Sequence, residues 1–82
     1  MIDNIQNQIS KIKEGSIVCI DDGEDKMMFR CKYKDNGYIL CSKDYGNYCT
    51  TCELDELHNI LFEDFGNGLI KKISVHNRED EI

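Results

Sequence analysis

The sequence predicts an α+β fold in which an antiparallel sheet of three to four strands carries two helices on one face, in the order α-β-β-β-α-β. Two segments place apolar residues at helical steps of three and four, and two others alternate apolar and polar residues as half-buried strands do. The connections between the first three expected strands are short, so these strands should form an antiparallel meander. Both amphipathic helices should then cover the same face of the sheet.

The first helix is expected over residues 2–13. Its isoleucines share one helical face: Ile2, Ile5, Ile9 and Ile12. Gly15 is expected to end this helix. A short β-branched run at residues 16–20 then predicts a strand, and the polar residues 21–25 predict a turn.

Residues 27–34 predict a half-buried strand, because their side chains alternate in character. One side holds Met27, Phe29, Cys31 and Tyr33, and the other holds Met28, Arg30, Lys32 and Lys34. The next sequence, Asp-Asn-Gly at residues 35–37, is typical of a hairpin turn, and residues 38–43 should return as the third strand.

Two registers are open for this hairpin. A two-residue turn at Asn36-Gly37 would pair Tyr33 with Leu40. A three-residue turn with Gly37 in the left-handed conformation would pair Tyr33 with Ile39, and Cys31 with Cys41. We favour the three-residue turn, because it puts Ile39 and Cys41 in the core, whereas the other register puts Ser42 there.

A second helix is expected over residues 51–65, after a loop at residues 43–48. Thr50 stands three residues before Glu53, the spacing of a capping box. The apolar positions of this helix recur at three and four: Leu54, Leu57, Leu61 and Phe65. Gly66 is the expected C-cap, and residues 69–76 predict a last strand by their alternation.

The chain is expected to form one domain over residues 1–76, followed by a polar tail at residues 77–82. A chain of 82 residues has room for one modest core. The residues predicted for it are Ile5, Ile9, Ile12, Phe29, Cys31, Leu57, Leu61 and Ile73. No apolar run is long enough for a membrane span, and the N-terminus has no signal-peptide character, so we expect a cytoplasmic protein.

The five cysteines are an odd number in a chain without an export signal, so they are expected to be reduced thiols. Cys49 and Cys52 form a Cys-x-x-Cys pair beside the expected helix start, where the helix dipole lowers a thiol pKa in redox enzymes. The same pair could supply half of a zinc site, with Cys31 or Cys41 as further ligands. The interpretation we prefer is that Cys31 and Cys41 are small packed strand residues, and that the protein holds no metal or cofactor.

The distribution of charge is the most informative feature of the sequence. Residues 14–25 and residues 53–65 each contain five acids and no Lys or Arg. The candidate partner-binding residues are Asp21, Asp22, Glu24, Asp25, Glu53, Asp55, Glu56, Glu63 and Asp64. The net charge of -6 argues against nucleic acid as a direct partner and favours a basic protein. Such acids can also form an ordinary solvated surface.

The layout resembles that of the small acidic phage anti-CRISPR proteins that inhibit Cas9. The shared features are the length, the acidity, the N-terminal isoleucine-rich helix, the meander with Asp-Asn-Gly followed by Tyr38-Ile39, and the acidic helical stretch. The resemblance implies that carboxylates occupy the site where Cas9 reads duplex DNA with arginines. The resemblance implies this mode of inhibition for the chain, but it assigns no individual contact residue.

We therefore expect a phage or mobile-element inhibitor that binds a basic, nucleic-acid-handling host protein, such as a CRISPR effector, through acidic patches that mimic phosphates. It would act in the host cytosol and not as an enzyme. A composition rich in Ile, Lys and Asn, with no Pro or Trp, fits an AT-rich phage or bacterial genome. The alternatives are a zinc- or thiol-containing structural or regulatory module, and an acidic antitoxin or immunity protein.

Overall fold

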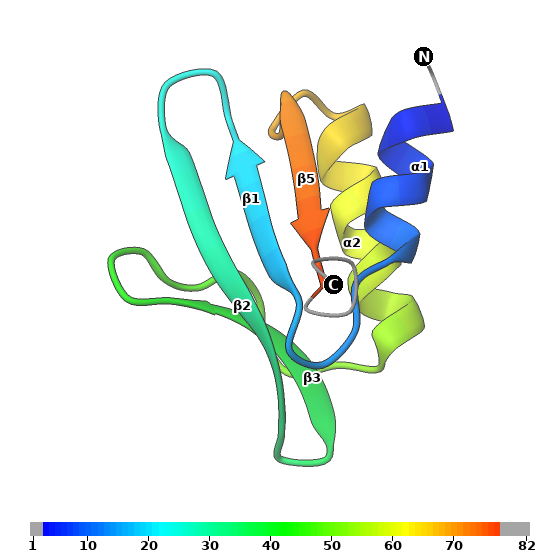
Figure 1. Cartoon of the computed structure of the whole chain (residues 1–82), viewed down its shortest axis with the longest axis vertical. Helices are drawn as coiled ribbons and strands as arrows, with labels where there is room; N and C mark the ends of the chain where they lie inside the picture. The colour runs from blue at the N-terminus through cyan, green and yellow to red at the C-terminus, as the bar shows by residue number, and fades with distance from the viewer. Residues whose placement is uncertain (1–2, 78–82) are drawn as a thin grey trace.

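Within residues 3–77, which the computed structural model describes, five antiparallel strands form one sheet with two helices on one of its faces (Figure 1). The elements are α1 (Asp3–Ser10), β1 (Ile17–Asp21), β2 (Lys26–Lys34), β3 (Gly37–Ser42), β4 (Gly46–Asn47), α2 (Leu54–Gly66) and β5 (Lys72–His76). The strands lie in the order β4-β3-β2-β1-β5. The predicted α+β class and antiparallel meander are confirmed, and β4 is an additional strand. No helix in this range is long and apolar enough to cross a membrane.

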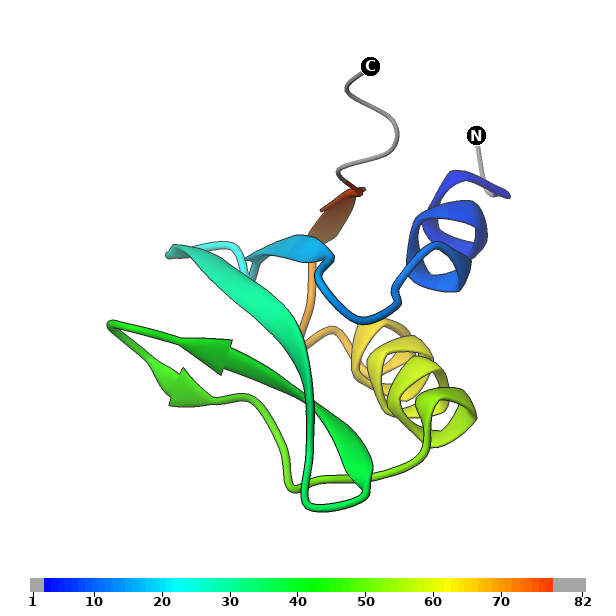
Figure 2. The same cartoon turned by 60° about the horizontal axis from the view of Figure 1, so that its bottom comes forward.

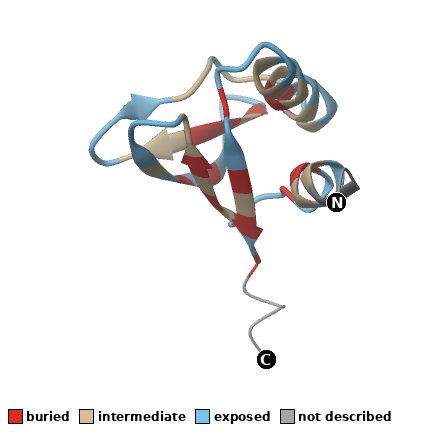
Figure 3. Cartoon of the chain, turned by 90° about the horizontal axis from the view of Figure 1, so that it is seen from above, coloured by how far each residue is buried: buried red, intermediate tan, exposed pale blue. Residues whose placement is uncertain are grey.

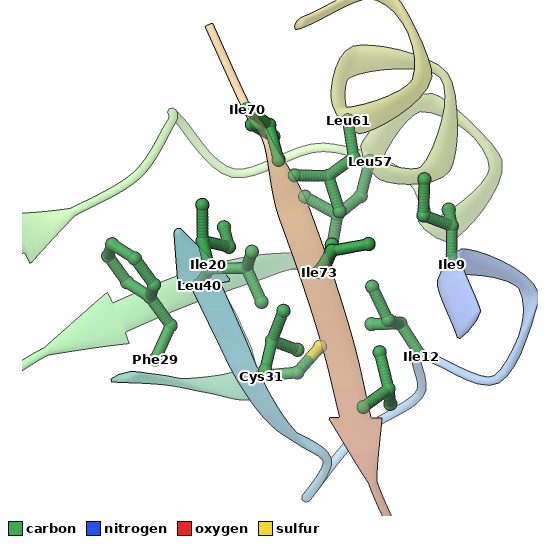
Figure 4. Close-up of a cluster of buried hydrophobic side chains, with 12 residues drawn as sticks. Ile9, Ile12, Ile20, Phe29, Cys31, Leu40, Leu57, Leu61, Ile70 and Ile73 are labelled. Carbon is green, nitrogen blue, oxygen red and sulfur yellow. The ribbon is translucent and has the colours of Figure 1, made fainter. Parts of the chain in front are cut away.

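One apolar core fills the space between the helices and the inner face of the sheet (Figure 2). Figure 4 shows side chains from both layers meeting there. The core consists of Ile9, Ile12, Val18, Ile20, Phe29, Cys31, Leu40, Leu57, Leu61, Ile70, Ile73 and Val75. The prediction is confirmed for seven of these residues, namely Ile9, Ile12, Phe29, Cys31, Leu57, Leu61 and Ile73. Ile5 is only partly buried, and Ile2 lies outside the described residues.

α1 ends at Ser10, earlier than the isoleucine spacing predicts. The N–H of Ile12 donates to the carbonyl of Ile9 at 3.1 Å, a tight three-residue step that is common where a helix ends. Gly15 has a φ of +92° and donates its N–H to the carbonyl of Cys31 at 2.8 Å. This bond joins the α1–β1 connection to β2.

A buried polar cluster ties the end of the described chain to the α1–β1 connection. The hydroxyl of Ser16 accepts the N–H of Lys13 at 2.9 Å and donates to the side-chain oxygen of Asn77. The side-chain nitrogen of Asn77 donates to the carbonyl of Lys11 at 2.9 Å. Asn77, which the sequence pattern assigns to the polar tail, is therefore buried and belongs to the folded domain.

The β2–β3 hairpin adopts neither predicted register. Its turn residues are Asp35 and Asn36, both with positive φ (54° and 63°), and Gly37 is already part of β3. Asp and Asn tolerate this conformation better than most residues, so the turn does not need the glycine. The observed pairs are Lys34↔Gly37, Tyr33↔Tyr38, Cys31↔Leu40 and Arg30↔Cys41.

This register puts Leu40 in the core and turns Ile39 and Cys41 to the outer face of the sheet. The core position predicted for Cys41 is therefore wrong. Ile39 is buried, but it lies outside the main core cluster.

The segment before α2, residues 46–52, runs along the edge of β3 that β2 does not occupy, instead of forming a loop. It is termed the edge segment. Asn47 pairs with Cys41, and Cys52 forms two backbone hydrogen bonds with Tyr38, at 2.7 and 3.0 Å. Five positions separate Asn47 from Cys52, whereas three separate Cys41 from Tyr38, so this edge carries a bulge. Because Cys52 is held in the sheet, α2 begins only at Leu54. Glu53 is its N-cap without a side-chain bond, and the predicted capping box is wrong.

The last strand begins later than residue 69, where the alternation predicts its start, because residues 69 and 70 are bonded to the end of α2. α2 ends at Gly66 with Asn67 as its C-cap, and the carbonyl of Asp64 accepts the N–H groups of Leu69 and Ile70 at 2.9 and 3.3 Å. These bonds delay the start of β5 to Lys72. As a result Ile70 is buried and Leu69 is exposed.

Replacing Leu57 or Leu61 with Ala should lower the free energy of unfolding by about 2 to 5 kcal/mol, because each side chain is fully buried and leaves a cavity. Leu69→Ala is the matched control. The side chain of Leu69 is 61% exposed, so its loss should change stability by less than about 0.5 kcal/mol. Urea denaturation measures all three variants. Equally small changes in all three would show that α2 packs through a different face.

Gly37→Ala should destabilise the domain by about 1 to 3 kcal/mol, because the pocket for a side chain there is already filled. A Cβ at position 37 would lie 2.7 Å from the Thr51 methyl carbon and 3.1 Å from the backbone of Cys52. Gly66→Ala is the control, since a Cβ there meets nothing within 4 Å. Thermal unfolding compares the two. A Gly37→Ala protein as stable as Gly66→Ala would mean that the edge segment does not pack on β3 in this way.

Candidate functional site

The β1–β2 turn uses two of its four carboxylates to hold its own shape. The side chain of Asp21 accepts the N–H of Gly23 at 2.8 Å. The side chain of Asp22 accepts the N–H groups of Glu24 and Asp25, each at 2.8 Å. The bonds from Asp25 and Glu24 lower the pKa of Asp22, because they stabilise its charged form. The exposed side chains of Glu24 and Asp25 are therefore the ones best placed for a partner.

Lys71 lies between this turn and the acids at the end of α2. Its N–H donates to the carbonyl of Asp21 at 2.7 Å, while the preceding Leu69 and Ile70 are bonded to Asp64. The stem of Lys71 crosses Gly23 so closely that a Cβ there would lie 3.3 Å from its Cγ. The β1–β2 turn therefore lies near the C-terminal end of α2, with the base Lys71 between the two.

The second acidic segment forms the solvent side of α2. Asp55, Glu56 and Glu63 are exposed, and so is the N-cap residue Glu53. Figure 3 shows exposed residues along the side of the helix that faces away from the sheet. Asp55 and Glu56 also lie in the first turn, where carboxylates interact favourably with the helix dipole.

Asp64 differs from its acidic neighbours because its carboxylate is engaged inside the domain. The Tyr48 hydroxyl donates to it at 2.5 Å and joins the edge segment to α2. Burial first, and then this donated bond, raise the pKa of Tyr48 well above its ordinary value. Asp64 thus has a clear structural role, which spacing along the helix does not reveal.

The outer face of the sheet carries opposite charge. Arg30, Lys32 and Lys34 lie on one face of β2 and are exposed, as the sequence predicts, and the exposed Lys26 extends this row. The sequence pattern does not reveal that a shallow groove of about 510 Å³ crosses this face, bounded in part by Ile17, Met28 and Cys41. Alternation already turns Met28 outward, whereas the favoured three-residue hairpin turn would have put Cys41 in the core; in the observed register Cys41 lies on the outer face with Met28.

Cys49 and Cys52 lie in the edge segment, ahead of the first turn of α2. Burial first, and then the nearby Cys52, raise the pKa of Cys49 to about 11. Burial and then the charge of Glu56 also raise the pKa of Cys52. Raised values are the opposite of what thiol redox chemistry requires, so the predicted activation by a helix start does not hold.

The possible zinc ligands are not brought together. Cys31 lies on the inner face of the sheet and Cys41 on the outer face, so they cannot coordinate one ion. Burial raises the pKa of Cys31 to about 11. Among residues 3–77, no three His, Cys, Asp or Glu side chains form a group that could hold a metal ion, and all five cysteines are free thiols.

The Cys49 thiol should resist alkylation. Its folded-state pKa of about 11 lies above the ordinary 9.0, so the protonated thiol stabilises the fold fully below pH 9.0, and this contribution is lost as the pH rises toward 11. Iodoacetamide at about pH 8 should therefore modify it more slowly in the folded than in the urea-unfolded chain, as mass spectrometry can measure. Cys49→Ser should remove part of the stability loss at high pH. Fast modification in the folded chain would contradict the burial of this thiol.

A scan against protein-family models, a search of curated proteins and a search of solved structures each gave no match to this chain. The resemblance to anti-CRISPR proteins stays a prediction from the layout of the sequence. The basis for a functional proposal is therefore the placement of charge on the two faces of the domain.

Proposed function

We propose that this domain is a phage or mobile-element inhibitor that binds a basic, nucleic-acid-handling host protein through the carboxylates of α2 and the β1–β2 turn. The observation that carries the proposal is the composition of α2. Its exposed face presents Asp55, Glu56 and Glu63, and the helix Leu54–Gly66 contains no Lys or Arg. A surface that carries only negative charge attracts a positively charged surface and repels a negatively charged one.

The acids on α2 are held at fixed spacing. Glu56 and Glu63 are seven residues apart, which is about two helical turns or about 10 Å along the axis. The opposite side of α2 is anchored by the fully buried Leu57 and Leu61. Because the helix is already packed, a partner would not have to order it, and little conformational entropy would be lost on binding.

The β1–β2 turn adds a second group of carboxylates at one end of the domain. In this proposal Glu24 and Asp25 contact the partner directly, while Asp21 and Asp22 hold the turn in shape through their side-chain bonds. Asp64 helps to hold α2 in place through the hydrogen bond that it accepts from Tyr48. The remaining candidate, Glu53, is exposed at the start of α2.

The partner best suited to such a surface has a row of Arg and Lys that normally contacts phosphates. Carboxylates on a rigid helix can pair with these bases and exclude nucleic acid from the site. A CRISPR effector that reads duplex DNA with arginines is one protein of this kind. A net charge of -6 on the inhibitor would also speed association with a basic partner.

Charge reversal on α2 tests this function. The immobilised domain is used to capture proteins from a nuclease-treated bacterial lysate, and association of the captured partner is then timed at several salt concentrations. Glu56→Lys with Glu63→Lys should slow association by about 10-fold and weaken its salt dependence. The control is Glu14→Lys with Asp44→Lys, which changes the net charge equally at exposed sites outside α2 and the turn.

A DNA competitor separates phosphate mimicry from other protein binding. Excess duplex oligonucleotide should release the captured partner, because both ligands would need the same bases. A partner that stays bound in excess DNA, or that binds both double variants equally well, would contradict the proposal. Release by DNA together with identification of a toxin nuclease would favour the immunity-protein alternative.

A further inference from the structure

The outer face of the sheet carries a groove that the acidic surface does not use. Both helices pack on the inner face, and neither helix covers the outer one (Figure 2). Ile17, Arg30 and Cys41 form one row across β1, β2 and β3, because Ile17 pairs with Arg30 and Arg30 pairs with Cys41. This row lines the groove of about 510 Å³ together with Met28 and Lys32.

Part of the groove lining is apolar, where a solvated sheet face is normally polar. The side chain of Met28 is 63% exposed, the largest exposed fraction among the exposed large hydrophobic residues of the described chain. Ile17 and Cys41 are each partly buried beside it. A methionine thioether adapts to differently shaped apolar side chains, which suits it to a binding surface.

Basic side chains also line the groove. Arg30, Lys32 and Lys43 all line it and are exposed. Along β2 they continue into Lys26 and Lys34 on the same face. This positive strip lies on a protein of net charge -6, on the side of the sheet away from the carboxylates of α2.

We propose that this groove binds an extended acidic segment of a partner protein, with an aliphatic side chain on Met28 and carboxylates on Arg30, Lys32 and Lys43. A second copy fits poorly, since symmetric pairing would place basic strip on basic strip. Single-stranded nucleic acid fits less well than a peptide, because the groove lining contains only one aromatic residue, Phe29, whose ring is buried in the core. The proposal does not depend on the function of α2, which lies on the other face.

The test follows the methionine methyl groups by NMR. The probe is a capped hexapeptide with two central leucines and two acidic residues on each side. It should shift the Met28 methyl resonance in a saturable way and leave that of Met27, which packs against the core, nearly unchanged. Lys32→Glu should weaken binding by about 5-fold or more. Lys11→Glu, the same change at an exposed site on the helical side, should alter it by less than about 2-fold.

Control ligands decide between the possible occupants. Replacing the two leucines by serine, or the four acids by glutamine, should abolish the shift if Met28 and the basic side chains both contribute to binding. A Met28 resonance that never moves, or that moves equally with the serine peptide or in Lys32→Glu, would overturn the proposal. So would tighter binding of a single-stranded oligonucleotide, or a shift that depends on protein concentration alone.

Discussion

The packing of one side of α2 against the sheet is the contact on which the other features of this domain depend. Leu57 and Leu61 are fully buried in the core that Leu40 and Ile73 help to form. Because these leucines fix the rotation of the helix, Asp55, Glu56 and Glu63 are turned to solvent. Both helices lie on this one side of the sheet, and no helix covers the opposite side. A single apolar contact thus separates an acidic face from a basic one.

Local periodicity was sufficient for the parts of the fold that have a strong repeat. The steps of three and four in α2 and the alternation in β2 predict the buried residues Leu57, Leu61, Phe29 and Cys31 correctly. What the repeats cannot predict is set by contacts between distant segments. The start of α2 depends on Cys52 pairing with Tyr38, and the burial of Asn77 depends on hydrogen bonds to the α1–β1 connection.

The sequence predicts which acids of the candidate surface are exposed better than it predicts the contacts that these acids make. Exposure of Asp55, Glu56 and Glu63 follows directly from the helical pattern. The engagement of Asp64 with Tyr48 does not, because the two residues come from different elements and meet only in the folded chain. The groove on the other face depends on the hairpin register, and the sequence Asp-Asn-Gly allows several turns. One residue of register decides whether Cys41 joins the core or the groove.

The side chain of Gln8 has a consequence for how the protein can associate. Gln8 reaches from α1 to accept the N–H of Val75 at 2.8 Å. This N–H belongs to β5, the last strand on its side of the sheet, where an unpaired backbone would offer a template for an incoming strand. With α1 lying along β5 (Figure 1), addition of a strand there is obstructed. The β5 edge is thereby protected from pairing with a strand of another molecule.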